Sequence, residues 1–173
     1  QLAHNIILLR RILIMAKVAR AARVASKQRA EPLGNGTSAP TAKAITAAET
    51  GELYLIDHNY AGELAITLPP IKEGNYFRFQ LMTQLSANGS ITFNKNAADA
   101  AGTIKGTVLC LVYAGSSADT TIATNKDAGS ATKFTILDDA HVGSYVEVYC
   151  DGTNYQFSGV VIADNLARAV FNA

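Results

Sequence analysis

The 173-residue chain has little charge and no tryptophan. Lys, Arg, Asp and Glu together make up 17% of the residues, which is well below the roughly 25% that is usual for a soluble domain. Ala, Thr, Ser, Gly and Asn therefore have to cover much of the surface, as in many β-proteins that live in assemblies. The lack of Trp disfavours a sugar-binding site built on a stacked indole ring.

The sequence also lacks the motifs of catalysis. It contains no Gly-rich phosphate loop, no G-x-S-x-G elbow and no nucleotide-binding fingerprint. Asp57-His58 and the group Asp138-Asp139…His141 fall at strand ends or in loops, where polar residues are expected as turn formers. We therefore expect that the protein is not an enzyme and needs no cofactor.

Metal ligands are equally scarce. The histidines lie far apart and have no partner at the spacing of a zinc site; they are His4, His58 and His141. Asp138, Asp139 and Asp151 lack the alternating ligands of a calcium loop. The two cysteines, Cys110 and Cys150, lie in apolar strand contexts, which favours buried thiols over a disulfide between adjacent strands. We expect no metal site.

Acidic residues are absent from residues 1–30, which carry seven cations. These cations are Arg10, Arg11, Lys17, Arg20, Arg23, Lys27 and Arg29. The remaining 143 residues contain eight basic and 14 acidic residues, a balance of −6 that is hidden by the overall net charge of +1. The charge pattern therefore predicts a basic N-terminal arm, residues 1–30, joined to a mildly acidic body.

The arm has an apolar and a basic part. Residues 1–15 are apolar around a central Arg10-Arg11 pair, and this pattern fits neither a membrane-spanning helix nor a signal peptide. Because the chain starts with Gln1 and Met15-Ala16-Lys17 would make an ordinary bacterial or phage start, we expect either an upstream extension of the reading frame or a processed terminus. Residues 16–30 favour a helix with a basic stripe.

Three interpretations of the arm stay open at this point. It is a solvated and partly disordered segment, a segment that docks on an acidic protein surface, or a segment that binds nucleic acid or anionic lipid. No aromatic residue is interleaved with the cations to stack on bases, which weakens the single-stranded version of the nucleic-acid interpretation.

The rest of the chain divides into three segments. Residues 31–51 mix Pro, Gly, Ser, Thr and Ala without apolar periodicity, which predicts a flexible linker. Residues 52–162 form the predicted body. The tail, residues 163–173, has apolar residues at helix-like spacing and is expected to dock on a neighbour or to cover the open edge of a sheet.

The body shows β-strand patterns throughout. Short runs rich in Ile, Tyr, Phe, Leu and Thr are separated by turn residues; these runs are 52–57, 64–69, 76–82, 90–94, 106–114, 133–138, 145–150 and 155–161. The polar stretch 115–132 is interpreted as a surface loop, with a short strand around Ile122 as the alternative. About eight such strands without a helical run between them predict an all-β fold, an antiparallel β-sandwich or jelly-roll-like domain.

Two local patterns refine this fold. In YVEVYC (145–150) alternate residues place Val146, Val148 and Cys150 on the core side, and DGTN (151–154) predicts the turn of a hairpin. Residues 67–79 align without gaps to 136–148, at an offset of 69, with a shared Leu, Gly and Tyr. The alignment predicts that one strand–loop–strand corner is used twice.

The runs ITLPPIKEGNYFRFQL, SITF and FTILDDAHVGSYVEVYCDGTNYQFSGVV resemble the β-domains of tailed-bacteriophage structural proteins, and most closely the capsid decoration (cement) proteins and the related head-fibre and tail-fibre modules. The resemblance covers roughly residues 64–161. It implies a virion protein, often a homotrimer, that sits on the outside of the capsid while its terminal arm holds neighbouring major capsid subunits.

We therefore expect a non-enzymatic, structural virion protein that is assembled in the host cytoplasm, located on the capsid surface and homo-oligomeric, with the arm cations as its contact to the major capsid protein. Fibre modules are usually embedded in longer chains, which favours decoration over fibre. The alternatives are a head- or tail-fibre module that binds a host receptor, and a nucleic-acid-associated protein that acts through the basic arm. No membrane partner is expected.

Overall fold

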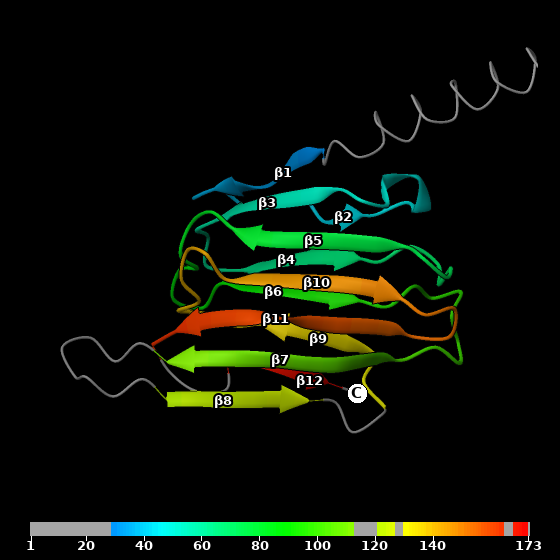
Figure 1. Ribbon diagram of the computed structural model, residues 1–173. Coiled ribbons are helices and arrows are strands. Elements are labelled where there is room, and N and C mark those ends of the chain that lie inside the picture. The colour runs from blue at the N-terminus through cyan, green and yellow to red at the C-terminus, as the bar shows by residue number, and fades with distance from the viewer. Residues whose placement is uncertain (1–28, 113–120, 127–129, 165–167, 173) are drawn as a thin grey trace, which may run out of the picture.

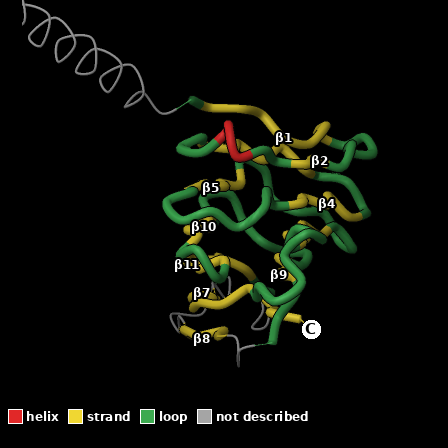
Figure 2. The backbone as a smooth tube through the Cα atoms, turned by 90° about the vertical axis from the view of Figure 1, so that its right-hand side faces the viewer, coloured by secondary structure: helices red, strands yellow, loops and turns green. Residues whose placement is uncertain are grey.

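The computed structural model describes residues 29–112, 121–126, 130–164 and 168–172, and for 121–126 the backbone alone. The described residues form two β-sheets that pack face to face around one core (Figures 1 and 2). Apart from one 3-10 helix, η1 (Ala47–Glu49), the regular elements of the described residues are strands. The predicted all-β fold is confirmed at this level.

Seven strands form one sheet and five form the other. The order in the seven-stranded sheet is β1 (Ala30–Gly36), β3 (Leu53–His58), β5 (Tyr76–Leu81), β10 (Tyr145–Cys150), β11 (Tyr155–Ala163), β7 (Ile104–Val112) and β8 (Thr121–Lys126). The order in the five-stranded sheet is β12 (Ala169–Asn172), β9 (Lys133–Ile136), β6 (Ser90–Asn94), β4 (Glu63–Thr67) and β2 (Lys43–Ala44).

The strand pairing is mixed, so the predicted antiparallel pairing of a sandwich or jelly roll is wrong. The pairs β1–β3, β3–β5 and β7–β11 are parallel in one sheet, and β2–β4 and β4–β6 are parallel in the other. The cause is the route of the chain, which changes sheet at every connection except β7–β8 and β10–β11. The chain reverses its direction from β3 to β4 and again from β4 to β5. β3 and β5 therefore run in the same direction and pair in parallel. The turn residues in the sequence do not show whether a connection crosses to the other sheet, as an arch, or joins two strands of the same sheet, as a hairpin.

The core is held together by aromatic rings from both sheets. Phe93 on β6 packs edge-on against Phe79 on β5, with 4.7 Å between ring centroids, and against Phe157 on β11 at 5.8 Å. Phe134 on β9 lies 5.1 Å from Phe157. Such pairs stabilise by about 0.5–1.5 kcal/mol each beyond their area burial. The two sheets therefore share one continuous core.

The predicted hairpin is confirmed. β10 and β11 pair antiparallel, and Val146, Val148 and Cys150 are fully buried. The turn is closed by Asp151, whose Oδ1 accepts hydrogen bonds from the backbone N–H groups of Thr153 at 2.8 Å and Asn154 at 2.6 Å. A hydrogen bond from the Gln156 side chain, together with these backbone bonds, lowers the pKa of Asp151 to about 2.

The repeated corner is also confirmed. The connections β4–β5 and β9–β10 each carry the chain from the five-stranded to the seven-stranded sheet. Gly74 and Gly143 occupy the matched position with φ angles of 86° and 89°, a conformation that favours glycine. The matched strands β5 and β10 are neighbours, and Arg78 Nη1 lies 3.0 Å from Glu147 Oε1 across them.

The prediction of a flexible linker at residues 31–51 is wrong. Residues 31–51 contain most of β1, all of β2 and η1, and both Leu33 and Ile45 are buried in the core. β1 is an edge strand with one buried side chain, Leu33, so it needs no alternating apolar pattern, and an edge tolerates Pro and Gly. The packed body therefore begins at β1 and not near Glu52.

Two further segments differ from the sequence analysis. Thr121–Lys126, interpreted as part of a loop with a short strand around Ile122 as the alternative, forms strand β8 at the edge of the seven-stranded sheet, so the alternative is confirmed. The C-terminal tail forms strand β12 and not a helix. β12 pairs with β9 and so covers the edge of the five-stranded sheet, as one of the two alternatives predicted, and Phe171 packs 4.8 Å from Phe134 in the core.

The cysteines are buried thiols, as expected. Cys110 lies on β7 and Cys150 on β10, with β11 between the two strands. Burial raises the pKa of the Cys150 thiol to about 11.

Candidate functional site at the root of the basic arm

The candidate capsid contact lies mostly outside the described residues. Six of its seven cations do so: Arg10, Arg11, Lys17, Arg20, Arg23 and Lys27. Arg29 is described, and 83% of its side chain is exposed. Its Nη1 lies 3.5 Å from Oε1 of Glu52, a residue that is 5% exposed. The arm thus enters the body beside a buried carboxylate.

The arm continues directly into β1. This strand pairs in parallel with β3 from Ala30↔Leu53 to Gly36↔His58, with one irregularity after Gly34. The Leu33 side chain is buried against the core. The backbone N–H of Leu53 donates to the carbonyl oxygen of Arg29 at 2.7 Å. The pairing therefore begins at the last residue of the arm.

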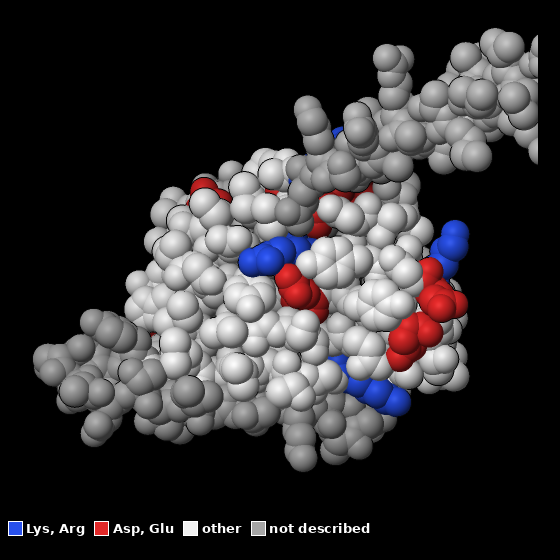
Figure 3. Space-filling model, viewed as in Figure 1, with Lys and Arg blue, Asp and Glu red and all other residues white. Residues whose placement is uncertain are grey.

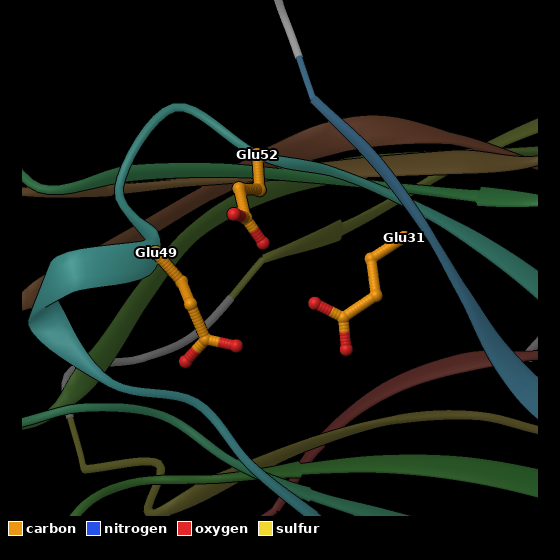
Figure 4. Close-up of side chains that lie close together, drawn as sticks. All are labelled: Glu31, Glu49 and Glu52. Carbon is orange, nitrogen blue, oxygen red and sulfur yellow. The ribbon is translucent and has the colours of Figure 1, made fainter.

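Three carboxylates gather where β1, η1 and β3 meet. They belong to Glu31, Glu49 and Glu52, and one oxygen of each lies within 4.8 Å of the others (Figure 4). Lys43 on β2 binds two of them, with its Nζ 2.7 Å from Glu31 Oε1 and 2.6 Å from Glu49 Oε1. We call the residues Glu31, Lys43, Glu49 and Glu52 the root cluster.

Local sequence explains how Glu49 is held in the root cluster. Thr46 precedes η1, and its hydroxyl donates to Glu49 Oε2 at 2.7 Å while its backbone N–H donates to the same oxygen. This arrangement is the capping box of a Thr-x-x-Glu sequence. The box fixes the Glu49 carboxylate between the Thr46 backbone and the Lys43 ammonium.

The electrostatics of the root cluster favour its charged form. Burial by itself would raise the pKa of Glu49, but the hydrogen bonds from Lys43 and Thr46 outweigh it and lower that pKa to about 2. Burial likewise opposes the Lys43 charge, yet the hydrogen bonds to Glu31 and Glu49 raise the Lys43 pKa. The Tyr54 hydroxyl is buried nearby, and its pKa is raised by burial and by the surrounding carboxylates.

Each carboxylate of the root cluster already has a cationic side chain beside it. The Lys43 ammonium already lies between two of the three carboxylates, and Arg29 approaches the third. A divalent cation that bound all three would have to displace Lys43 and break both of its ion pairs. We therefore interpret the root cluster as an ion-pair network that fixes β1, the strand nearest the arm, to β2, η1 and the start of β3.

The root cluster is not predicted by the sequence pattern, because three of its four residues fall in residues 31–51, the expected linker. The only local signal is the capping box, Thr46 followed by Glu49 three residues later. The ion pairs of Lys43 join residues six positions apart, with Glu49, and 12 positions apart, with Glu31. Such contacts depend on the arch from β1 to β2, which the sequence pattern does not specify.

The polar groups considered for catalysis have structural partners. Arg168 Nη1 lies 2.7 Å from Asp138 Oδ1, and its Nη2 lies 3.1 Å from Asp139 Oδ2. His141 Nε2 lies 2.9 Å from Asp164 Oδ1. His58 is fully buried, with its Nε2 3.0 Å from the carbonyl oxygen of Gly62. These contacts tie loops to strands and bring no nucleophile beside a base.

Searches with protein-family models, among curated proteins and among solved structures found no match to this chain. In the described part of the chain, no helix is long and apolar enough to cross a membrane.

Proposed function

We propose that this protein is a structural virion protein that binds the outer surface of a phage capsid and stabilises the shell, with its basic arm as the tether to major capsid subunits. The observation that carries the proposal is the root of the arm. A tether works when the body holds its end firmly, and here β1 is held by strand pairing and by the root cluster. The sandwich-like body supplies a rigid scaffold.

The charge distribution supports a protein partner for the arm. Seven cations precede β1 without a single acidic residue, whereas the rest of the chain is net acidic. A basic arm of this kind is attracted to an acidic capsid surface. Symmetric binding of a homo-oligomer, with a trimer as the form that the resemblance implies, would multiply modest individual contacts through effective concentration.

The test is binding of the purified full chain to capsids that lack decoration protein. Replacing Lys17, Arg20 and Arg23 by Gln removes three arm charges, and we expect at least a tenfold loss of affinity, since each contact is worth up to about 1 kcal/mol. The matched control replaces three body cations by Gln: Lys72, Lys105 and Lys133. We expect this control to bind within twofold of the unmodified protein.

Binding of the same proteins to genomic DNA and to host cells is measured in parallel. Capsid binding at fixed stoichiometry that depends on the arm charges would support the tether. Saturable binding to DNA with a steep salt dependence, and none to capsids, would overturn the proposal in favour of nucleic-acid binding. Binding to host cells alone would overturn it in favour of a fibre module.

A further inference from the structure

The outer face of the seven-stranded sheet, which faces away from the five-stranded sheet, carries an apolar band. Strand register places five side chains in one row across β3, β5, β10, β11 and β7. The row consists of Leu55, Gln80, Tyr145, Val160 and Leu109. We call it the outer band. Each of these residues alternates with a buried core residue on its strand, so the row points outward.

Further apolar side chains extend the outer band along the strands. Ile162 on β11 and Leu111 on β7 are register partners, two residues after Val160 and Leu109. Leu109 is 40% exposed and Met82, directly after β5, is 46% exposed. Apart from Gln80, the side chains of the outer band and these neighbours are apolar, and an exposed apolar patch is typical of an interaction site.

Charge is sparse next to the outer band. Arg78 and Glu147 form an ion pair in the row next to the outer band, with 3.0 Å between Nη1 and Oε1. The Arg78 guanidinium also lies 4.6 Å from the Tyr145 ring centroid. Figure 3 shows one blue and one red group side by side near the centre of the face, with uncharged atoms around them. A covering segment would therefore meet few unpaired charges.

None of the described strands covers this face. All twelve belong to the two sheets, and the five-stranded sheet packs on the opposite side (Figure 2). The outer band is thus an apolar surface that the described part of the chain leaves open.

The same chain contains an apolar segment without a described partner surface. Eight of the ten residues 6–15 are Ile, Leu or Met. At helical spacing, Leu8, Leu9, Ile12 and Leu13 share one side, and Arg10 and Arg11 lie on the other. Such a segment would place its apolar side on a sheet and its two arginines toward solvent.

The length of the arm matches the distance to be covered. Fourteen residues lead from Met15 to Arg29, and even a helix of that length spans about 21 Å. In the sheet, β11 is the fourth strand after β1, and four spacings between neighbouring strands correspond to about 19 Å. Residues 6–15 can therefore reach the outer band of their own chain.

We propose that residues 6–15 dock on the outer band of the same chain. Burial of Ile and Leu side chains against Tyr145, Val160 and Leu109 drives the docking. The cations from Lys17 to Arg29 then form an exposed basic loop that starts and ends on the body. The inference concerns a different surface from the capsid contact and does not depend on it.

The test places the photoreactive residue benzoylphenylalanine at Leu109 in the full chain. After irradiation, cross-linked peptides are mapped by mass spectrometry in an equal mixture of light and heavy isotope-labelled protein. We expect links from position 109 to residues 6–15 within one label. A probe at Tyr60, an exposed aromatic residue in the β3–β4 loop, is the control and should give at most one tenth of these links.

A pair of variants separates docking from chance contact. Leu8→Asp with Ile12→Asp should reduce the links at least fivefold, whereas Ala21→Asp with Ala25→Asp adds the same charge outside the segment and should leave them unchanged. Links between light and heavy chains, or links from position 109 to the body of a second copy, would overturn docking within one chain. An equal yield from Leu109 and Tyr60, or equal loss in both variants, would overturn docking itself. No capsid is used, so this result and the capsid-binding result stand separately.

Discussion

At the scale of single residues, Lys43 joins three parts of the chain at the root of the arm. Its ammonium binds Glu31 on β1 and Glu49 on η1 from its own position on β2. It also lies 5.7 Å from the Tyr54 ring centroid. Its loss would leave the carboxylates of Glu31 and Glu49 without their shared counter-charge.

We expect Lys43→Gln to lower the free energy of unfolding by about 1–2 kcal/mol, between the values typical of surface and buried ion pairs. Urea unfolding at pH 7 measures the change. Lys72→Gln is the control, with an expected change within about 0.5 kcal/mol. Equal effects of the two substitutions would contradict a stabilising role of the root cluster.

The same substitution has a defined pH dependence. The pKa of Glu49 in the folded protein is about 2, below its ordinary value of 4.5. The stability from its ion pair is therefore fully present above pH 4.5 and is lost as the pH falls toward 2. The difference between wild type and Lys43→Gln should shrink over this interval; a difference that stays constant down to pH 2 would rule out the ion pair as its source.

At the scale of elements, the central strands β7 and β11 are in close contact at Gly106. This residue has a φ angle of 130°, and a Cβ atom there would overlap the Phe157 carbonyl group. Phe157 is its register partner on β11. The two backbones can approach as they do because Gly106 has no side chain.

We expect Gly106→Ala to cost about 3 kcal/mol or more, because backbone strain and a steric clash add. Gly143→Ala is the matched control. It also has a positive φ, but no heavy atom lies within 4 Å of the added Cβ, and we expect a cost of about 1 kcal/mol. Urea unfolding of both variants gives the comparison, and similar costs would show that the close approach is not required.

Local patterns were enough to find most strands. The alternation in YVEVYC gave the buried face of β10, and DGTN gave its turn, because both depend on neighbouring residues. β1 was missed because it buries a single side chain, Leu33, and β12 because its few apolar residues also fit helical spacing. The parallel pairing and the root cluster depend on arches between the sheets, which no local pattern encodes.

At the scale of the whole molecule, the aromatic core makes the two sheets one unit. Phe93 and Phe134 from the five-stranded sheet contact Phe79 and Phe157 from the seven-stranded sheet. Since almost every connection crosses between the sheets, neither sheet is a continuous stretch of chain. Separate unfolding of one sheet would expose the core of the other.

We therefore expect the body to unfold in a single transition. Pulsed hydrogen exchange across a urea titration can follow β5 in one sheet and β6 in the other. The two strands should lose protection at the same urea concentration. Midpoints that differ by more than the experimental error would show that the sheets are separate folding units.

The place of the last hairpin in the seven-stranded sheet has a consequence for synthesis. β10 and β11, near the C-terminal end of the chain, lie between β5 and β7. While a ribosome is still making residues 145–163, both of these older strands have an unpaired edge, which favours aggregation. A nascent chain that stops before β11 lacks the strand that pairs with both β10 and β7 in this sheet. The seven-stranded sheet is therefore complete only in chains that are synthesised past β11.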